Sequence, residues 1–214
     1  MKKLLFVNSC VRGEASRTQE LCRFYIDGFI KSQKEHGLEW ETEEVTAAIM
    51  GSLKPLDRAE LELREKLLSK GDFSHGMFNQ AKQIIEADHI VIGAPYWDLQ
   101  FPAILKTYLE RCSVTGLTFV YDENGVPHGK CRAHWLTYIT TSGGPIDDMN
   151  FGYDYICGLC GLFGIDETHF VSAESLDIVG SNVPEIMEEA KVKITEILKQ
   201  MEGRQSEYTE HGSS

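Results

Sequence analysis

Positive charge is scarce in this chain. The 21 lysine and arginine residues face 33 aspartate and glutamate residues, which gives a formal net charge of −12 over 214 residues. A nucleic-acid backbone is recognised through a basic surface, so this balance argues against a nucleic-acid partner. It equally disfavours adsorption to an anionic membrane. A protein of this charge can still hold one phosphate, provided that local backbone N–H groups are the donors.

Long hydrophobic runs are also missing. No apolar stretch approaches the roughly 20 residues that cross a bilayer. The apolar start of the chain ends at Asn8, short of the roughly 7–15 apolar residues of a signal peptide, so we expect a buried strand at residues 3–9 instead. The composition, 42% hydrophobic and 25% charged, is ordinary for a globular protein. We predict a cytoplasmic protein with one domain over residues 1–203 and a flexible tail over residues 204–214.

The cysteines form neither a disulfide framework nor a metal-ligand pattern. Six scattered cysteines indicate reduced thiols in a cytosol. Cys157 and Cys160 form a C-x-x-C, but a zinc site needs a second ligand pair, and the histidines offer no suitable spacing. A thioredoxin-like pair would follow a strand, whereas this one lies in the apolar segment 155–163. We predict small buried cysteines and no metal. The six are Cys10, Cys22, Cys112, Cys131, Cys157 and Cys160.

What the chain does contain is an alternation of strand and helix patterns. The clearest buried strand is 88–95, and the ring of Pro95 helps to end it. Alternation of this kind predicts βαβ units, and hence an α/β fold with a doubly wound, five-stranded parallel sheet and helices on both faces. The expected strands are 3–9, 38–45, 88–95, 133–141 and 168–172, with a hairpin around Asp122–Gly125. Helices are expected from Ser16, within 56–68, and over 77–87, 103–111, 153–163 and 186–201.

Three loops leave carboxyl ends of these strands, at residues 9–18, 95–100 and 141–145. Ligands of such sheets bind beyond the carboxyl ends, so we expect the three loops to converge. The first loop lacks both G-x-G-x-x-G and G-K-[ST], which excludes the usual dinucleotide and triphosphate loops. It instead places hydroxyls and cations at a helix start, where a compact monophosphate can be wrapped. The alternative is that Ser16 or Thr18 merely caps that helix.

The second and third loops suit a flat ring. Tyr96 and Trp97 follow a buried strand and offer an apolar wall of the kind that an isoalloxazine needs, although Trp97 could instead cap the core. Gly143 and Gly144 allow the backbone to approach a ring closely. The alternative is an ordinary Gly-Gly-Pro turn.

At these places the chain resembles the FMN-dependent NADH-azoreductases, within the wider group of NAD(P)H:quinone oxidoreductases of flavodoxin-like fold. The match spans roughly residues 3–200. The residues that carry it are Ser9 with Ser16-Arg17-Thr18, residues 94–102 (APYWDLQFP), 116–121 (GLTFVY) with Glu123-Asn124-Gly125, and 139–144 (ITTSGG), continued by 161–165 and 170–174.

The resemblance implies FMN as cofactor, NADH or NADPH as co-substrate, and ping-pong hydride transfer to quinones, azo compounds or similar flat aromatic acceptors. It also implies a homodimer with each flavin near the subunit interface. The phosphate would be held by Ser9, Ser16, Arg17 and Thr18. The ring would be lined by Pro95, Tyr96, Trp97, Asp98 and Leu99, and its pyrimidine side would meet Thr141, Ser142, Gly143 and Gly144.

The chain departs from the family's pattern at residues 96–99 (YWDL), where the family often has Met-Tyr-Asn-Phe, and again after the Gly-Gly. No catalytic residue is assigned. Asp98 stands where the family often has asparagine, and Ile146 stands where a histidine is common. Tyr121 is a candidate wall of the substrate pocket. The hairpin at 117–129 is expected to expose Phe119 and Tyr121, a surface that a symmetric dimer would bury.

Two other functions remain open at this point. The chain could be a flavodoxin-like electron carrier serving protein partners, or a flavin-free interaction protein on the same fold.

Overall fold

Five strands form a single parallel sheet. The computed structural model describes residues 1–211, and the side chains of residues 1–202. The strands are β1 (Lys2–Asn8), β2 (Trp40–Val45), β3 (His89–Gly93), β6 (Trp135–Thr141) and β7 (Glu167–Ala173). Their order is β2-β1-β3-β6-β7, and each neighbouring pair is parallel. This is the flavodoxin-like strand order once the small hairpin is set aside, so the predicted fold class is confirmed.

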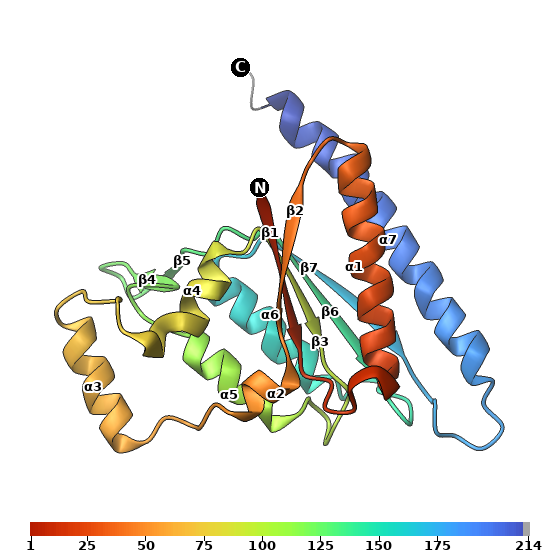
Figure 1. Cartoon of the computed structure of the whole chain (residues 1–214), viewed down its shortest axis with the longest axis horizontal. Coiled ribbons are helices and arrows are strands. Elements are labelled where there is room, and N and C mark those ends of the chain that lie inside the picture. The colour runs from red at the N-terminus through yellow and green to blue at the C-terminus, as the bar shows by residue number, and fades with distance from the viewer. Residues whose placement is uncertain (212–214) are drawn as a thin grey trace.

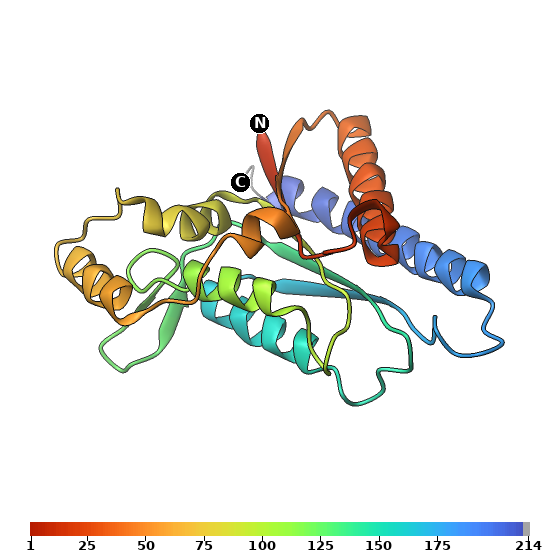
Figure 2. The same ribbon diagram turned by 60° about the horizontal axis from the view of Figure 1, so that its bottom comes forward.

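Helices cover both faces of the sheet (Figure 1; Figure 2). On one face lie α1 (Arg17–Glu35) and α7 (Val183–His211), which run side by side. The other face carries α2 (Ala47–Gly51), α4 (Asn79–Glu86), α5 (Ala103–Cys112) and α6 (Phe151–Phe163). The short α2 is absent from the sequence-based expectation, as are the 3-10 turns Gly13–Ala15 and Gly76–Phe78.

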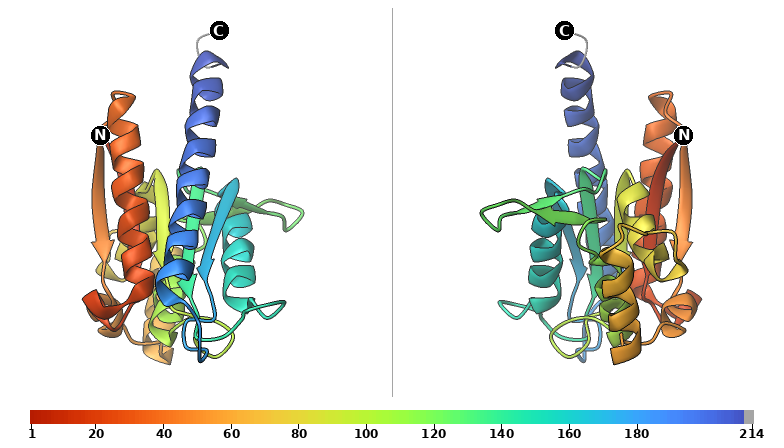
Figure 3. Two further views of the ribbon diagram at one scale, coloured as in Figure 1. Left: turned by 90° about the vertical axis from the view of Figure 1, so that its right-hand side faces the viewer. Right: turned by 90° about the vertical axis from the view of Figure 1, so that its left-hand side faces the viewer.

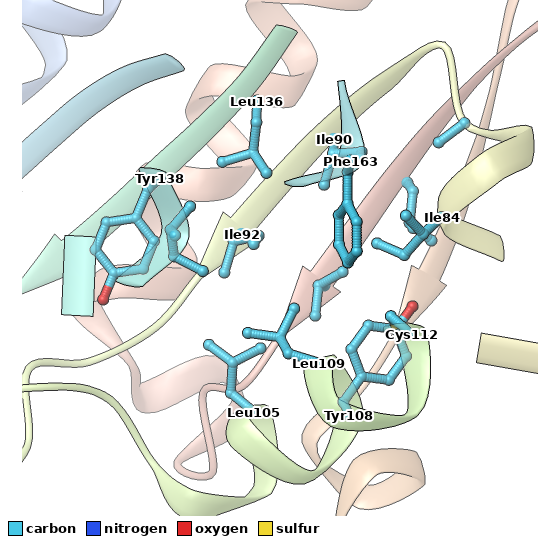
Figure 4. Packing of buried hydrophobic residues seen from close by; sticks show 14 of the residues in the cluster. Ile84, Ile90, Ile92, Leu105, Tyr108, Leu109, Cys112, Leu136, Tyr138 and Phe163 are labelled. Carbon is cyan, nitrogen blue, oxygen red and sulfur yellow. The ribbon is translucent and has the colours of Figure 1, made fainter. Parts of the chain in front are cut away.

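The core is divided by the sheet, because successive strand side chains point to opposite faces. All five residues of β3 are buried. Val91 packs into the cluster under α1 and α7, whereas Ile90 and Ile92 pack against α5 and α6. Figure 4 shows Leu105 and Leu109 of α5 facing these two isoleucines. A run buried on both sides is typical of parallel strands, which explains the clear signal of β3 in the sequence.

The segment between α2 and α4 is an excursion that carries α3 (Arg58–Leu68), as expected for a charged stretch. α3 has no fully buried residue, and a capping box between Asp57 and Glu60 starts it. Arg111 of α5 ties the excursion to the fold. Its Nη2 lies 3.0 and 3.1 Å from the two carboxylate oxygens of Glu60, and its Nε donates to the Lys54 carbonyl at 3.0 Å.

The predicted hairpin forms, with β4 (Phe119–Tyr121) antiparallel to β5 (Pro127–Gly129), and projects from the sheet (Figure 3). The expectation that Phe119 is exposed is wrong: it is 6% exposed, whereas Tyr121 is 55% exposed. The reason is docking of the hairpin on the end of α6. A Cβ on Gly129 would lie 1.9 Å from the Phe163 carbonyl carbon, so only glycine permits this contact. The docking covers Phe119 and leaves Tyr121 outside.

Helix α7 runs on to His211, into the segment expected to be a tail, and residues 212–214 lie outside the described part. All six cysteines are free. Cys160 of the C-x-x-C is buried, as expected, whereas Cys157 is only half-buried. Burial raises the pKa of the Cys160 thiol to about 12. Within residues 1–211, no helix combines the length and apolarity needed to span a membrane, and no cluster of candidate metal ligands was found.

Candidate functional site

The loops after β1, β3 and β6 meet at one edge of the sheet, as predicted, and enclose a pocket of about 250 Å³. In Figure 2 this edge comes forward. It lies beyond the carboxyl ends of β1 and β3, which is the switch point where a doubly wound sheet binds its ligand. The lining residues are Cys10, Val11, Arg12, Ser16, Arg17, Thr18, Pro95, Tyr96, Trp97, Thr141, Ser142, Gly143, Leu176 and Asp177.

The first loop brings the start of α1 to the pocket. Ser16 is the N-cap of this helix, and its hydroxyl accepts the Gln19 N–H at 3.3 Å. The capping role and the pocket-lining position therefore coexist at Ser16. Thr18 Oγ1 lies 2.6 Å from Thr141 Oγ1 and links the first loop to the third. Ser9 does not line the pocket. It is buried, and its backbone N–H and its hydroxyl both donate to the Gly93 carbonyl at 2.9 Å.

The second loop places Pro95, Tyr96 and Trp97 on the pocket wall. The Tyr96 N–H donates to the Thr141 carbonyl at 3.0 Å, and its hydroxyl donates to the Met149 carbonyl at 2.9 Å. Burial, followed by the charge of Glu174, raises the pKa of Tyr96. Trp97 is 46% exposed, so the alternative that it caps the core is wrong.

Asp98 and Leu99 form a tight turn at the tip of this loop and do not line the pocket. Gln100 N–H donates to the Trp97 carbonyl at 2.8 Å, and the reverse bond measures 3.2 Å. The φ angles of Asp98 and Leu99 are +48° and +69°. Two successive left-handed residues are the geometry of a type I′ turn, which strains a leucine.

The third loop contributes Thr141, Ser142 and Gly143, whereas Gly144 lies outside the lining. The Ser142 hydroxyl donates to the Gly144 carbonyl at 2.5 Å, which fixes the turn. A Cβ on Gly143 would lie 2.7 Å from Asp177 Oδ2. The Asp177 side chain therefore rests on Gly143, and a larger residue there would push this carboxylate aside.

A fourth loop, after β7, reaches the pocket through Leu176 and Asp177, which the sequence reasoning missed. Leu176 N–H donates to the Ser142 carbonyl at 3.1 Å, and Asp177 N–H donates to the Gly143 carbonyl at 3.0 Å. The only signal for this fourth loop in the sequence is the position of residues 174–182 after the last strand.

Cys10 and Val11 of the first loop also line the pocket and were not predicted to do so. Burial raises the pKa of Cys10 to about 11, so its thiol stays protonated at neutral pH.

Positive charge in the pocket is concentrated on one side. Arg12 and Arg17 line it beside the N-terminus of α1, and a helix N-terminus adds a partial positive charge. Tyr121 is not brought to this pocket. It lies on the exposed side of the hairpin. This arrangement can hold a small dianion next to an aromatic wall.

Comparison with known proteins agrees with this geometry. Residues 2–198 match the family described as having a flavodoxin-like fold. The FMN-dependent NADH:quinone oxidoreductase of Clostridium beijerinckii is 32% identical over 202 residues, which cover 93% of this chain and 99% of that protein. The protein of the same name from Coprothermobacter proteolyticus is 28% identical over 216 residues, covering 94% and 100%.

Solved structures show the same fold at lower identity. An azoreductase from Bacillus anthracis superposes with a TM-score of 0.77 at 20% identity, covering 94% of this chain and 100% of that one. A Bacillus anthracis FMN-dependent NADH-azoreductase in complex with FMN gives a TM-score of 0.76 at 19% identity, covering 94% and 99%. The resemblance inferred from the sequence is thereby confirmed, and the chain belongs to the flavodoxin-like fold family and, through its relatives, to the FMN-dependent NADH:quinone oxidoreductases.

Proposed function

We propose that this chain binds FMN in the pocket at the β1–β3 switch point and transfers electrons from NADH to quinones, azo compounds or similar flat aromatic acceptors. The family assignment makes it an FMN-dependent oxidoreductase with NADH as co-substrate. The observation that supports this function best is the convergence of a monophosphate-sized loop and an aromatic wall in one pocket.

The residues present fit FMN. The first N–H groups of α1 have no carbonyl partner inside the helix. Ser16 caps that of Gln19, which leaves those of Arg17 and Thr18 to bind a phosphate. Ser16, Arg17 and Thr18, the N-cap and the first two residues of α1, line the pocket. Trp97 supplies the apolar wall. Ser9 would act indirectly, because it fastens the end of β1 to the end of β3. Asp98 and Leu99 would present backbone groups at the rim rather than side chains within the pocket.

FMN held by these residues would supply the redox chemistry that links a reduced nicotinamide to an acceptor. The protein's task is to bind, orient and stabilise charge. Backbone dipoles of the third loop would stabilise negative charge beside the ring. We assign no acid–base residue. The Cys10 thiol has a pKa of about 11 and does not supply a thiolate at neutral pH.

We further propose a cytoplasmic homodimer. A pocket of about 250 Å³ is smaller than the roughly 300–1,000 Å³ of ordinary ligand sites, so one chain would enclose a flavin only in part. The loops at this edge of the sheet and the first residue of α6 form an apolar rim of side chains that are 41–101% exposed: Val11, Trp97, Leu99, Met149, Phe151, Ile178 and Val179. Such a rim suits a self-complementary interface. In that dimer Tyr121 would help to form the acceptor pocket of the other subunit.

The test combines cofactor identity with turnover. Mass spectrometry of the heat-released cofactor should find FMN, and the loaded protein should oxidise NADH with quinone or azo acceptors. Light scattering should give a dimer mass. Release of FAD, or of no flavin, would contradict the cofactor assignment. A flavin-loaded dimer that is inert to every acceptor would favour the electron-carrier alternative, and a fully active monomer would refute the shared pocket.

A further inference from the structure

An ion pair bridges two walls of the pocket. Arg17, the first residue of α1, places Nη1 3.1 Å from Oδ1 of Asp177 in the loop after β7. Both residues line the pocket, although they lie 160 positions apart in the chain. Asp177 is the one acidic side chain among the lining residues of the described chain. A negative charge therefore occupies the site where a phosphate is expected to be held.

The backbone fixes the position of this carboxylate. Ser175 has a φ of +62° and turns the chain back over the third loop. Its N–H donates to the Gly144 carbonyl at 3.2 Å, and the Asp177 N–H donates to the Gly143 carbonyl at 3.0 Å. The Asp177 side chain then rests on Gly143, where a Cβ would lie 2.7 Å from Oδ2. Asp177 is thus directed towards Arg17 by its own loop.

The Arg17–Asp177 ion pair affects how the pocket can bind a phosphate. A phosphate monoester carries a charge of about −1.5 to −2 at neutral pH, so it competes with Asp177 for the same guanidinium and is repelled by its carboxylate. We propose that Asp177 is an internal competitor for Arg17. It lowers the affinity of the pocket for the phosphate of its flavin and so sets the selectivity between phosphorylated and unphosphorylated flavins. This inference rests on the proposed binding of FMN.

The test is Asp177→Asn, which keeps the size of the side chain and removes its charge. Apo-protein is titrated with FMN and, separately, with riboflavin, which lacks the phosphate, and flavin fluorescence reports each Kd. We expect FMN to bind about two- to fivefold more tightly to D177N, because an ion pair as exposed as this one is worth about that much. Riboflavin affinity should change less than about twofold.

Two controls separate competition from general charge effects. Asp166→Asn removes the same charge at the opposite end of β7, where Asp166 Oδ2 lies 3.3 Å from His134 Nδ1, and it should leave both affinities unchanged. In an Arg17→Gln background, D177N should raise FMN affinity less than in the wild type, because the shared cation is gone. The fold should survive, since the side chains of Arg17 and Asp177 are 40% and 73% exposed. Asp177→Ser is a second route to the same loss of charge.

The outcomes distinguish this inference from the proposed function. If wild-type protein binds FMN and D177N leaves the ratio of FMN to riboflavin affinity unchanged, the competition is refuted and FMN binding stands. Weaker FMN binding by D177N would refute it too, because Asp177 would then be holding Arg17 in its binding position. An equal gain in FMN affinity in D166N would also refute the competition, because the gain would then come from the net charge of the protein and not from Arg17. If wild-type protein binds neither flavin, the proposed function and this inference both fail.

Discussion

The contact between Gly129 and α6 gives the sharpest test of how the hairpin is held. In Gly129→Ala the added Cβ would lie 1.9 Å from the Phe163 carbonyl carbon, 2.0 Å from the Gly164 nitrogen and 2.1 Å from the Phe163 oxygen. All three atoms are backbone, so no side chain can rotate away, and the hairpin must lift from α6. Lifting exposes Phe119, whose burial is worth about 1.5–3 kcal/mol.

We therefore expect G129A to lose about 2–3 kcal/mol of stability, which corresponds to a fall in Tm of about 5–10 °C for a chain of this length. Thermal and urea unfolding measure the loss, and limited proteolysis should cut the freed hairpin sooner. Gly158→Ala is the matched control. Gly158 lies in α6, the helix on which the hairpin docks, and an added Cβ there would meet nothing within 4 Å. It should be neutral or stabilising by up to about 1 kcal/mol. An unchanged Tm for G129A would refute the docking argument.

Three further predictions follow from the pocket and the core. Ser16→Asp should weaken FMN binding by about 2–3 kcal/mol while keeping the helix, since aspartate is also a good N-cap. Titration of apo-protein measures this, riboflavin is the control, and unchanged FMN affinity would place the phosphate elsewhere. Leu99→Asn should stabilise the fold by about 0.5–1 kcal/mol, because asparagine tolerates the φ of +69° better than leucine does. A lower Tm would contradict the strain. Stability should also fall in acid, because burial, helped by the charge of His169, lowers the pKa of His89 to about 3. The unfolded chain binds this proton below about pH 6.5 and the folded chain does not until about pH 3, so the loss is about 1.4 kcal/mol per unit across that window. Urea unfolding between pH 7 and pH 5 tests this, and His89→Gln should flatten the dependence. An equally steep dependence in H89Q would assign the effect to other groups.

The sequence predicted the parts of the fold that local chemistry determines. The apolar run ending at Pro95 could only be a buried strand, and the hydroxyl of Ser16 marked the start of α1 correctly. The convergence of three loops followed from parallel strands alone, because their carboxyl ends share an edge.

What sequence reasoning missed depends on contacts between distant segments. Phe119 looks exposed in a short hairpin, and its burial requires the end of α6 to receive Gly129. Asp177 becomes a pocket residue because β7 lies beside β6, so that its loop bonds to Gly143. Ser9 looked like a phosphate ligand by resemblance, yet its hydroxyl is engaged with the Gly93 carbonyl. No local pattern encodes these pairings.

The edge strand β2 limits how copies of this protein can associate. It carries Glu41, Glu43 and Glu44 within six residues and is paired on one side, with β1. Glu43 and Glu44 are ion-paired with Lys3 and Arg23, whereas Glu41 is exposed. A second β2 laid along the free side would set this acidic row against its own copy, which disfavours extension of the sheet by another strand. Association through this border of the sheet is therefore disfavoured, and the helices and loops are the surfaces left for it.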